Sequence, residues 1–138
     1  MHIRKARPVA LALVAVTALG LGSTLPANAG DDGTCAAERA CLFENRDYNT
    51  GYPQHWRDFA GDDYDLSNNY WKTYGGVDTN DIMNDETSSV RTNGCTVFLF
   101  QHAGYAGAFS YWLAGDRDGD LSNNGIGENR TSSVDVIC

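Results

Sequence analysis

Residues 99–105, Leu99-Phe100-Gln101-His102-Ala103-Gly104-Tyr105, repeat the pattern of residues 42–48, Leu42-Phe43-Glu44-Asn45-Arg46-Asp47-Tyr48. Two further matches follow in the same order along the chain. Asp65-Leu66-Ser67-Asn68-Asn69 corresponds to residues 120–124, and Thr87-Ser88-Ser89-Val90 corresponds to residues 131–134. Three ordered matches indicate a duplicated unit, with halves at about residues 41–94 and 95–138.

Each half consists of short apolar or aromatic stretches separated by turns rich in Gly, Asp, Asn and Ser. Residues 96–100, T-V-F-L-F, predict a buried strand, and residues 108–113, A-F-S-Y-W-L, predict another. No stretch after residue 30 keeps a helical apolar period for three turns, so we expect single-turn helical pieces at most. The sequence therefore predicts an all-β sandwich with four short strands in each half.

The two halves differ in length at one place. Fourteen residues separate Asn69 from Asn84, whereas three separate the matching Asn124 from Glu128. The first half therefore carries extra residues around positions 70–76, with three aromatic side chains and two glycines. Such a segment either folds over the end of the sandwich or is presented to a partner. The candidate partner contacts in this segment are Tyr70, Trp71 and Tyr74.

Residues 1–29 have the composition of a signal peptide. A cationic start is followed by an apolar run of about 13 residues, Val9–Leu21, and then by the small residues Ala27 and Ala29. The run is too short for a permanent membrane-spanning helix. The sequence therefore predicts cleavage after Ala29 and secretion of residues 30–138 as a single domain.

The secreted part is expected to be strongly acidic. The full chain has 10 Lys and Arg against 18 Asp and Glu, a net charge of −8. Removal of residues 1–29 takes three cationic residues away and leaves a net charge of about −11. An acidic surface disfavours nucleic acid and anionic membranes as partners, since both bind cationic surfaces. The charge is compatible with cation binding and equally with solubility alone, and we expect a monomer.

The cysteines after residue 30 are Cys35, Cys41, Cys95 and Cys138. An even number in a short exported chain predicts two disulfides, for which three pairings are possible. The favoured pairing joins Cys35 to Cys41 in a small loop and Cys95 to Cys138 across the second half. A zinc site is the alternative. It is disfavoured because there is no Cys-x-x-Cys pair, and the imidazoles left after residue 30 are those of His55 and His102.

The repeated stretch also spaces two aromatic residues and a glycine over one tight hairpin. The first aromatic lies on a strand, the second folds back over the hairpin, and the glycine supplies a backbone conformation that is costly for other residues. The second half has Phe100, Tyr105 and Gly107 at these positions. The first half has Phe43, Tyr48 and Gly51, the glycine one place late. This pattern resembles the Greek-key signature of the βγ-crystallins. The resemblance covers Cys35 to Cys138 and implies a sandwich of two tandem Greek-key motifs.

A second motif strengthens the resemblance. Microbial βγ-crystallins bind calcium through a loop of the form Asn/Asp-Asn/Asp-x-x-Ser/Thr-Ser. Residues 84–89, N-D-E-T-S-S, match every specified position, and residues 128–133, E-N-R-T-S-S, match all but the first. A hard cation takes about six to eight oxygens, which carboxylates, amides, carbonyls and hydroxyls of tight loops can supply. The ligands that the resemblance implies are Asn84, Asp85, the carbonyl of Glu86 and Ser88 in one loop, Asn129, the carbonyl of Arg130 and Ser132 in the other, and Glu44 and Gln101 from the first hairpin of each half.

The same residue types have an explanation without a metal. Asn, Asp and Ser side chains also hydrogen-bond the backbone of their own turns. Both loops can therefore be self-satisfied turns. The departure at Glu128 and the positive charge of Arg130 make the second loop the weaker candidate.

The start of the first half carries a narrower resemblance. Cys35, Cys41, Leu42 and Phe43 are arranged as in the bacterial secreted peptidase inhibitors of βγ-crystallin fold. This resemblance implies inhibition of an extracellular protease by a rigid loop that enters its active-site cleft, because a pre-ordered loop loses little entropy on binding.

An alternative of a different class is a calcium-stabilised structural, cell-wall or carbohydrate-binding module, or a toxin-like protein, without inhibitory activity. In that case Trp71 and Tyr74, if exposed, could stack on sugar rings. We do not expect an enzyme. His55 and His102 lie in no recognisable catalytic motif, and no Gly-x-Ser-x-Gly sequence occurs.

Overall fold

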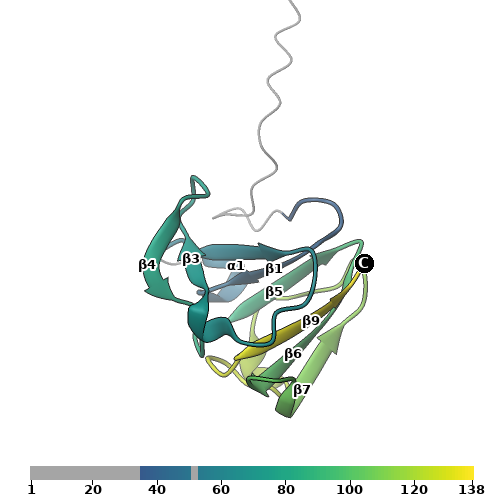
Figure 1. Cartoon of the computed structure of the whole chain (residues 1–138). Coiled ribbons are helices and arrows are strands. Elements are labelled where there is room, and N and C mark those ends of the chain that lie inside the picture. The colour runs from purple at the N-terminus through teal and green to yellow at the C-terminus, as the bar shows by residue number, and fades with distance from the viewer. Residues whose placement is uncertain (1–34, 51–52) are drawn as a thin grey trace, which may run out of the picture.

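The computed structural model describes residues 35–50 and 53–138 (Figure 1). The predicted signal peptide and Gly51 lie outside the described residues. The elements in chain order are β1 (Arg39–Phe43), α1 (Arg46–Asn49), β2 (Trp56–Phe59), η1 (Leu66–Asn68), β3 (Tyr70–Lys72), β4 (Asp78–Ile82), β5 (Ser89–Asn93), β6 (Thr96–His102), β7 (Ala106–Trp112), β8 (Arg117–Asp118), η2 (Leu121–Asn123) and β9 (Ser133–Ile137).

Two antiparallel sheets form the layers of a sandwich. The larger has the order β4-β3-β2-β1-β5-β8 and the smaller has the order β7-β6-β9, and Figure 1 shows β1 and β5 layered over β6 and β9. Helical structure in the described residues consists of α1, one irregular turn, and the short 3₁₀ turns η1 and η2. The prediction of an all-β Greek-key sandwich is confirmed, but the first half has five strands, β1–β5, instead of the expected four.

The two halves exchange short edge segments. β8 comes from the second half but pairs with β5 of the first half, in the register Val90↔Asp118. In return, Asp63 of the first half pairs with Val134 of β9, and each residue donates a backbone hydrogen bond of 2.8 Å to the other. Neither sheet is therefore completed by one half alone.

The aromatic pair of each hairpin is arranged as the repeat predicts. Phe100 and Tyr105 meet edge to face with ring centroids 5.7 Å apart, and Phe43 and Tyr48 do the same at 5.8 Å. Gly107 has φ of +84°, and a Cβ there would lie 2.6 Å from the His102 ring. The glycine of the pattern thus meets both a backbone and a space requirement.

The repeated Asp-Leu-Ser-Asn-Asn segments form the two 3₁₀ turns. Asp65 caps η1 by accepting a hydrogen bond from the Ser67 N–H at 3.0 Å, and Asp120 caps η2 in the same way. The leucine of each turn, Leu66 or Leu121, is fully buried. The repeat therefore encodes a cap and a core residue together.

One strand is less buried than its sequence suggests. Residues 108–113 were expected to form a buried strand, but β7 is the edge of the smaller sheet and only its Trp112 is in the core. Phe109 and Tyr111 are each more than half exposed. They pack on Phe100 and Phe98 of β6 instead, with ring centroids 5.7 and 5.5 Å apart. Since no third layer formed by residues 35–50 or 53–138 covers this face, its aromatic side chains shield one another.

The extra residues of the first half form a hairpin of β3 and β4 at the edge of the larger sheet. Trp71 is fully buried in the core, beside residues such as Leu66 and Met83. The suggestion that Trp71 is exposed and stacks on sugar rings is therefore wrong. Tyr74, at the tip, is 60 % exposed. The segment packs against the core through Trp71 and presents Tyr74 to solvent at its tip. Each of the two expected roles is thus carried by one of these residues.

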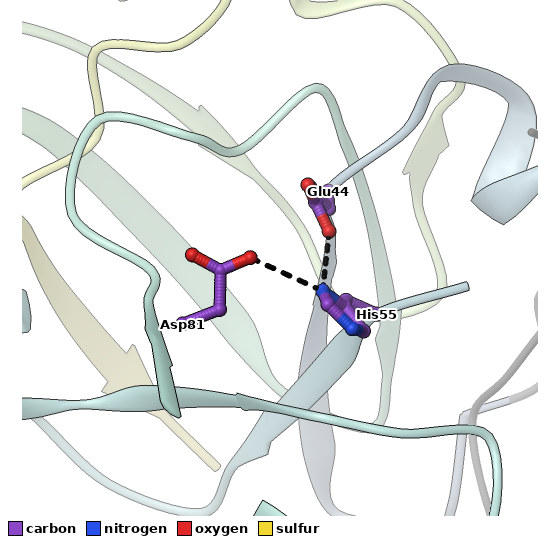
Figure 2. Close-up of side chains that lie close together, drawn as sticks. All are labelled: Glu44, His55 and Asp81. Atoms are coloured by element: carbon purple, nitrogen blue, oxygen red, sulfur yellow. Dashed lines mark ion pairs between the residues drawn. The ribbon is translucent and has the colours of Figure 1, made fainter. Parts of the chain in front are cut away.

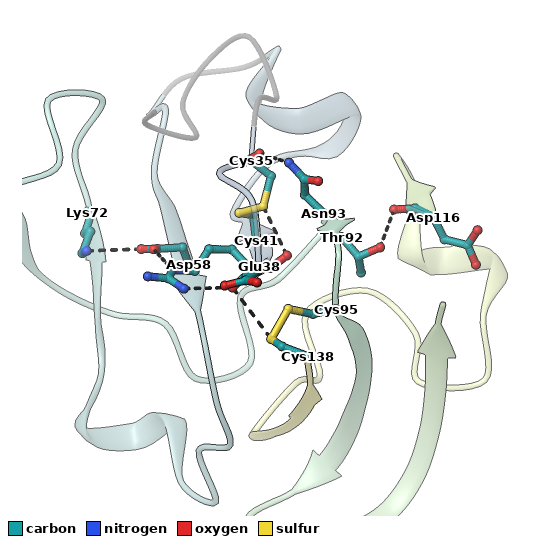
Figure 3. Close-up of a disulfide and its surroundings, with 11 residues drawn as sticks. Cys35, Glu38, Cys41, Asp58, Lys72, Thr92, Asn93, Cys95, Asp116 and Cys138 are labelled. Carbon is teal, nitrogen blue, oxygen red and sulfur yellow. Dashed lines mark hydrogen bonds and ion pairs between the residues drawn. A yellow bond between two sulfur atoms is a disulfide. The ribbon is translucent and has the colours of Figure 1, made fainter. Parts of the chain in front are cut away.

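Two disulfides, Cys35–Cys41 and Cys95–Cys138, give the favoured pairing (Figure 3). The second bridge fastens the last residue of the chain to the start of β6, and Cys138 Sγ lies 3.7 Å from the Glu38 carbonyl. Disulfides are compatible with an extracellular protein. Within the described ranges, the chain forms no helix of the length and apolarity needed to cross a membrane.

Candidate functional site

The two Asn/Asp-rich loops, residues 84–89 and 128–133, lie against each other and exchange backbone hydrogen bonds. The Asp85 N–H donates to the Thr131 carbonyl at 2.9 Å, and the Asn129 N–H donates to the Thr87 carbonyl at 3.0 Å. The two bonds join equivalent positions of the two halves. We refer to residues 84–89 and 128–133 together as the paired loops.

The second position of each loop has a left-handed backbone. Asp85 has φ of 61° and Asn129 has φ of 57°. Asn and Asp tolerate this region better than other residues with a side chain. The preference of the motif for Asn or Asp at this position therefore has a backbone cause, in addition to any role in metal binding.

The last serine of each loop holds the hairpin of its own half. Ser89 Oγ donates to the Asn45 carbonyl at 2.6 Å and accepts from the Tyr48 N–H at 3.2 Å. Ser133 Oγ donates to the His102 carbonyl at 2.7 Å and accepts from the Tyr105 N–H at 3.1 Å. These serines fix the paired loops beside the hairpins.

The preceding serine of each loop faces the opposite loop. Ser88 Oγ lies 3.0 Å from Glu128 Oε1 and 3.3 Å from Asn129 Oδ1, while Ser132 Oγ donates to Asp85 Oδ1 at 3.0 Å. The expected sets put Asp85 with Ser88 and Asn129 with Ser132. In the structure the exchanged backbone bonds bring each left-handed residue beside the serine of the other loop, while Asp85 and Ser88 also line one cavity.

A cavity of about 440 Å³ opens between the paired loops and the first hairpin. Every side chain around it is polar, and four are carboxylates. The lining residues are Glu44, Asn45, Asp85, Glu86, Ser88, Glu128 and Asn129. The structure thus brings together five of the nine predicted ligand residues with Asn45 and Glu128, which the prediction omitted.

The other predicted ligands lie outside this cavity. The residues that do not line it are Asn84, Gln101, Arg130 and Ser132. The side-chain amide of Asn84 donates to Asp85, and Gln101 Oε1 is 3.4 Å from the Ala108 N–H. Ser132 belongs to the second half and contacts Asp85. In the pseudo-symmetric arrangement its position matches that of Ser88 in the first half.

Arg46 is a residue of the site that sequence reasoning missed. Its guanidinium pairs with Glu128 and lies 3.4 Å from Asp120. This pairing holds the pKa of the Glu128 carboxyl below its ordinary value, and the hydrogen bond from Ser88 acts in the same direction. The partners are 82 residues apart, so no local pattern signals the contact.

Glu44 is perturbed in the opposite direction. Burial raises the pKa of its carboxyl, the nearby carboxylates of Asp81 and Glu86 raise it further, and His55 acts to lower it. The Trp71 indole N–H donates to Glu86 Oε2 at 2.9 Å and keeps that carboxylate at the cavity. Several carboxylates thus approach one another at this end of the sandwich, an arrangement that favours either protonation or a bound cation.

Replacement of Arg46 by Met should raise the pKa of Glu128 toward its ordinary value of 4.5. In the wild-type protein the folded-state pKa is below the unfolded one. The ionised carboxylate therefore stabilises the fold above the unfolded pKa, and this stabilisation disappears as the pH falls through the lowered value. A carboxyl-detected NMR titration in EDTA measures the pKa directly. An unchanged Glu128 titration in Arg46→Met would contradict the assigned cause.

Comparison with known proteins supports the fold by structure alone. No protein-family model and no curated protein sequence matches the chain. A structure described under the evolution of the eye-lens βγ-crystallin domain fold is 20 % identical, covers 74 % of this chain and 87 % of its own, and has a TM-score of 0.57. A βγ-crystallin from an archaeon is 18 % identical, with coverage of 74 % and 100 % and a TM-score of 0.51.

Spherulin 3a from Physarum polycephalum gives a similar result. It is 20 % identical, the match covers 75 % of this chain and 86 % of that protein, and the TM-score is 0.51. The similarity extends over about three quarters of the chain in each of these comparisons. The chain therefore has the fold of a βγ-crystallin domain.

Proposed function

We propose that the protein is a secreted βγ-crystallin-type module that binds Ca²⁺ at the paired loops. The observation that carries this proposal is the cavity of about 440 Å³ lined entirely by polar side chains. Calcium prefers carboxylate, amide, carbonyl and hydroxyl oxygens in a flexible arrangement. The carboxylates of Asp85 and Glu86, the amide of Asn129 and the hydroxyl of Ser88 supply these groups, while the Glu44 carboxylate contacts His55 at 2.6 Å.

The charge balance of the cavity supports a cation. Four carboxylates line it, and among the described side chains Arg46 pairs with Glu128 and the His55 imidazole contacts Glu44. A divalent ion would offset the repulsion among the remaining carboxylates. Ser88 faces the loop of residues 128–133, and Asp85 faces Ser132 of that same loop. An ion bound here would therefore also bridge the two halves. We therefore expect calcium to stabilise the whole domain, and not only the loops.

Calcium should raise the thermal midpoint of the purified protein relative to EDTA. An ion that binds only the folded state adds about 2.7 kcal/mol at a free concentration of one hundred times its dissociation constant. The double variant Ser88→Ala/Ser132→Ala removes both facing hydroxyls and should lose most of the calcium-dependent shift. The matched control, Ser67→Ala/Ser122→Ala, removes the equivalent pair of serines from η1 and η2 and should keep it. An absent shift in the wild-type protein would mean that the loops are self-satisfied turns.

A second function, inhibition of an extracellular protease, is favoured by the rigidity of the β3–β4 tip. The Thr73 N–H donates to the Val77 carbonyl and the Gly76 N–H donates to the Thr73 carbonyl, both at 2.8 Å. The Trp56 indole N–H donates to the Thr73 carbonyl at 2.9 Å. Trp71 anchors the strand below in the core. The tip is thus ordered in advance and projects Tyr74, the property that an inhibitory loop needs.

Tyr74→Ala should weaken inhibition at least tenfold without lowering the thermal midpoint, if the tip enters a protease cleft. The measurement is residual activity of a panel of secreted metallo- and serine proteases at near-stoichiometric protein. Tyr111→Ala is the matched control, since Tyr111 is a similarly exposed tyrosine (57 % against 60 %) on the other sheet. An equal loss in both variants, or no inhibition by the wild-type protein, would rule out this use of the tip. Co-sedimentation with a wall polysaccharide, lost in Tyr111→Ala, would favour a carbohydrate-binding module on β7.

A further inference from the structure

Beside the calcium cavity, three side chains from different segments converge in a way that the calcium proposal does not explain. Glu44 follows β1, His55 precedes β2, and Asp81 lies on β4 of the inserted hairpin (Figure 2). We propose that Glu44, His55 and Asp81 form a separate site for a divalent transition-metal ion, for which Zn²⁺ is the best fit. The proposal does not depend on calcium binding at the paired loops.

The distances among the donor atoms suit one ion. His55 Nδ1 lies 2.6 Å from Glu44 Oε2 and 3.5 Å from Asp81 Oδ2. One donor atom from each residue lies within 4.8 Å of the other two. Around a tetrahedral zinc ion, with Zn–N and Zn–O bonds near 2.1 Å, neighbouring ligand atoms are separated by roughly 3.4 Å. Small side-chain rotations would therefore bring all three donors into the coordination shell.

A second observation concerns the hydrogen bonding of these atoms. Glu44 Oε2 and His55 Nδ1 are both inaccessible to solvent, and among the described residues the short contact of each, at 2.6 Å, is with the other. A carboxylate oxygen can accept more than one hydrogen bond, so this contact leaves a lone pair for an ion. Ligands of one metal ion lie side by side with their lone pairs directed at the ion instead of at each other. Metal coordination would satisfy both atoms at once.

The surrounding charges also favour an ion. No lysine or arginine in the described part of the chain forms an ion pair with Glu44 or Asp81. The Asp81 side chain is 44 % exposed, which leaves one side open for entry of the ion and for a water ligand. His55 also borders a second cavity, of about 220 Å³, beneath the Tyr74 tip. The site is therefore accessible although its two closest donor atoms are buried.

The chemical types of the three donor atoms determine which ion fits the site. Imidazole nitrogen suits zinc and similar transition metals, whereas calcium prefers oxygen ligands alone. An ion here would tie the β3–β4 hairpin to the ends of β1 and β2. Because Asp81 belongs to the insertion of the first half, the second half has no counterpart. We infer that the ion holds the inserted hairpin, with its exposed tip, against the sandwich.

Isothermal titration of Zn²⁺ into the purified protein, in excess Ca²⁺ to fill the oxygen-rich cavity, tests the proposal. We expect one strong site per chain, a higher thermal midpoint with Zn²⁺, and a shift of the His55 imidazole resonances in NMR spectra. His55→Gln should weaken Zn²⁺ binding at least tenfold. His102→Gln is the matched control: His102 is exposed at the corresponding hairpin of the second half and belongs to no such cluster. It should bind Zn²⁺ like the wild-type protein.

Asp81→Asn provides a variant on the half-exposed edge strand, which should fold even if His55→Gln does not. It should also weaken Zn²⁺ binding at least tenfold while leaving the calcium-dependent midpoint shift unchanged. Absence of a strong site in the wild-type protein, or wild-type affinity in Asp81→Asn, would overturn the proposal. Equal weakening by His102→Gln would show adventitious surface binding and would overturn it as well. Because the calcium shift is measured separately in each variant, failure of either metal site is recognised independently.

Discussion

The exchange of backbone hydrogen bonds between residues 84–89 and 128–133 is the contact on which the rest of the structure depends. It places each left-handed residue, Asp85 or Asn129, beside the serine of the other half. The next serine in each loop then fixes the hairpin of its own half. The peptide carbonyls of Ser88 and Ser132 accept from the N–H groups of Leu121 and Leu66, at 3.0 and 2.9 Å, and so position η2 and η1. A short polar segment thus organises loops, hairpins and 3₁₀ turns of both halves.

This arrangement explains why a cavity rich in carboxylates exists in a stable domain. The loops must contain Asn or Asp for backbone reasons and serines for hydrogen bonding, so oxygen atoms gather where the loops meet. Folding brings Glu44 and Glu86 to the same place, and the indole of buried Trp71 holds Glu86 there. The resulting repulsion is offset on one side by Arg46. At the remaining carboxylates of the cavity, a bound cation would offset the repulsion. The same loops therefore determine both the structure and the proposed function.

The sequence predicted the fold well because the fold rests on local signals that occur twice. The hairpin aromatics could be read from spacing within a half, the duplicated Asp-Leu-Ser-Asn-Asn segments form the two 3₁₀ turns, and the favoured one of three cysteine pairings is the one observed. The predicted ligands were less complete because the site forms between halves: the contacts of Ser88 with Glu128, and of Arg46 with Glu128, join residues 40 and 82 positions apart. The β7 aromatics were expected to be buried and are not, and the burial of Trp71 was left open, for a related reason. Burial depends on which face a neighbouring layer covers, and composition does not reveal that.

In the proposed function, one calcium ion is shared between the loops of the two halves. The most direct test is a double-mutant cycle on calcium affinity, measured by titration calorimetry, with Asp85→Asn in one loop and Asn129→Gly, which keeps the left-handed backbone accessible, in the other. Residues that share one ion should be coupled, so the double variant should differ from the sum of the single variants by about 0.5 kcal/mol or more. Additive effects of the two substitutions would mean that Asp85 and Asn129 act at different places, and would contradict a site built from both halves.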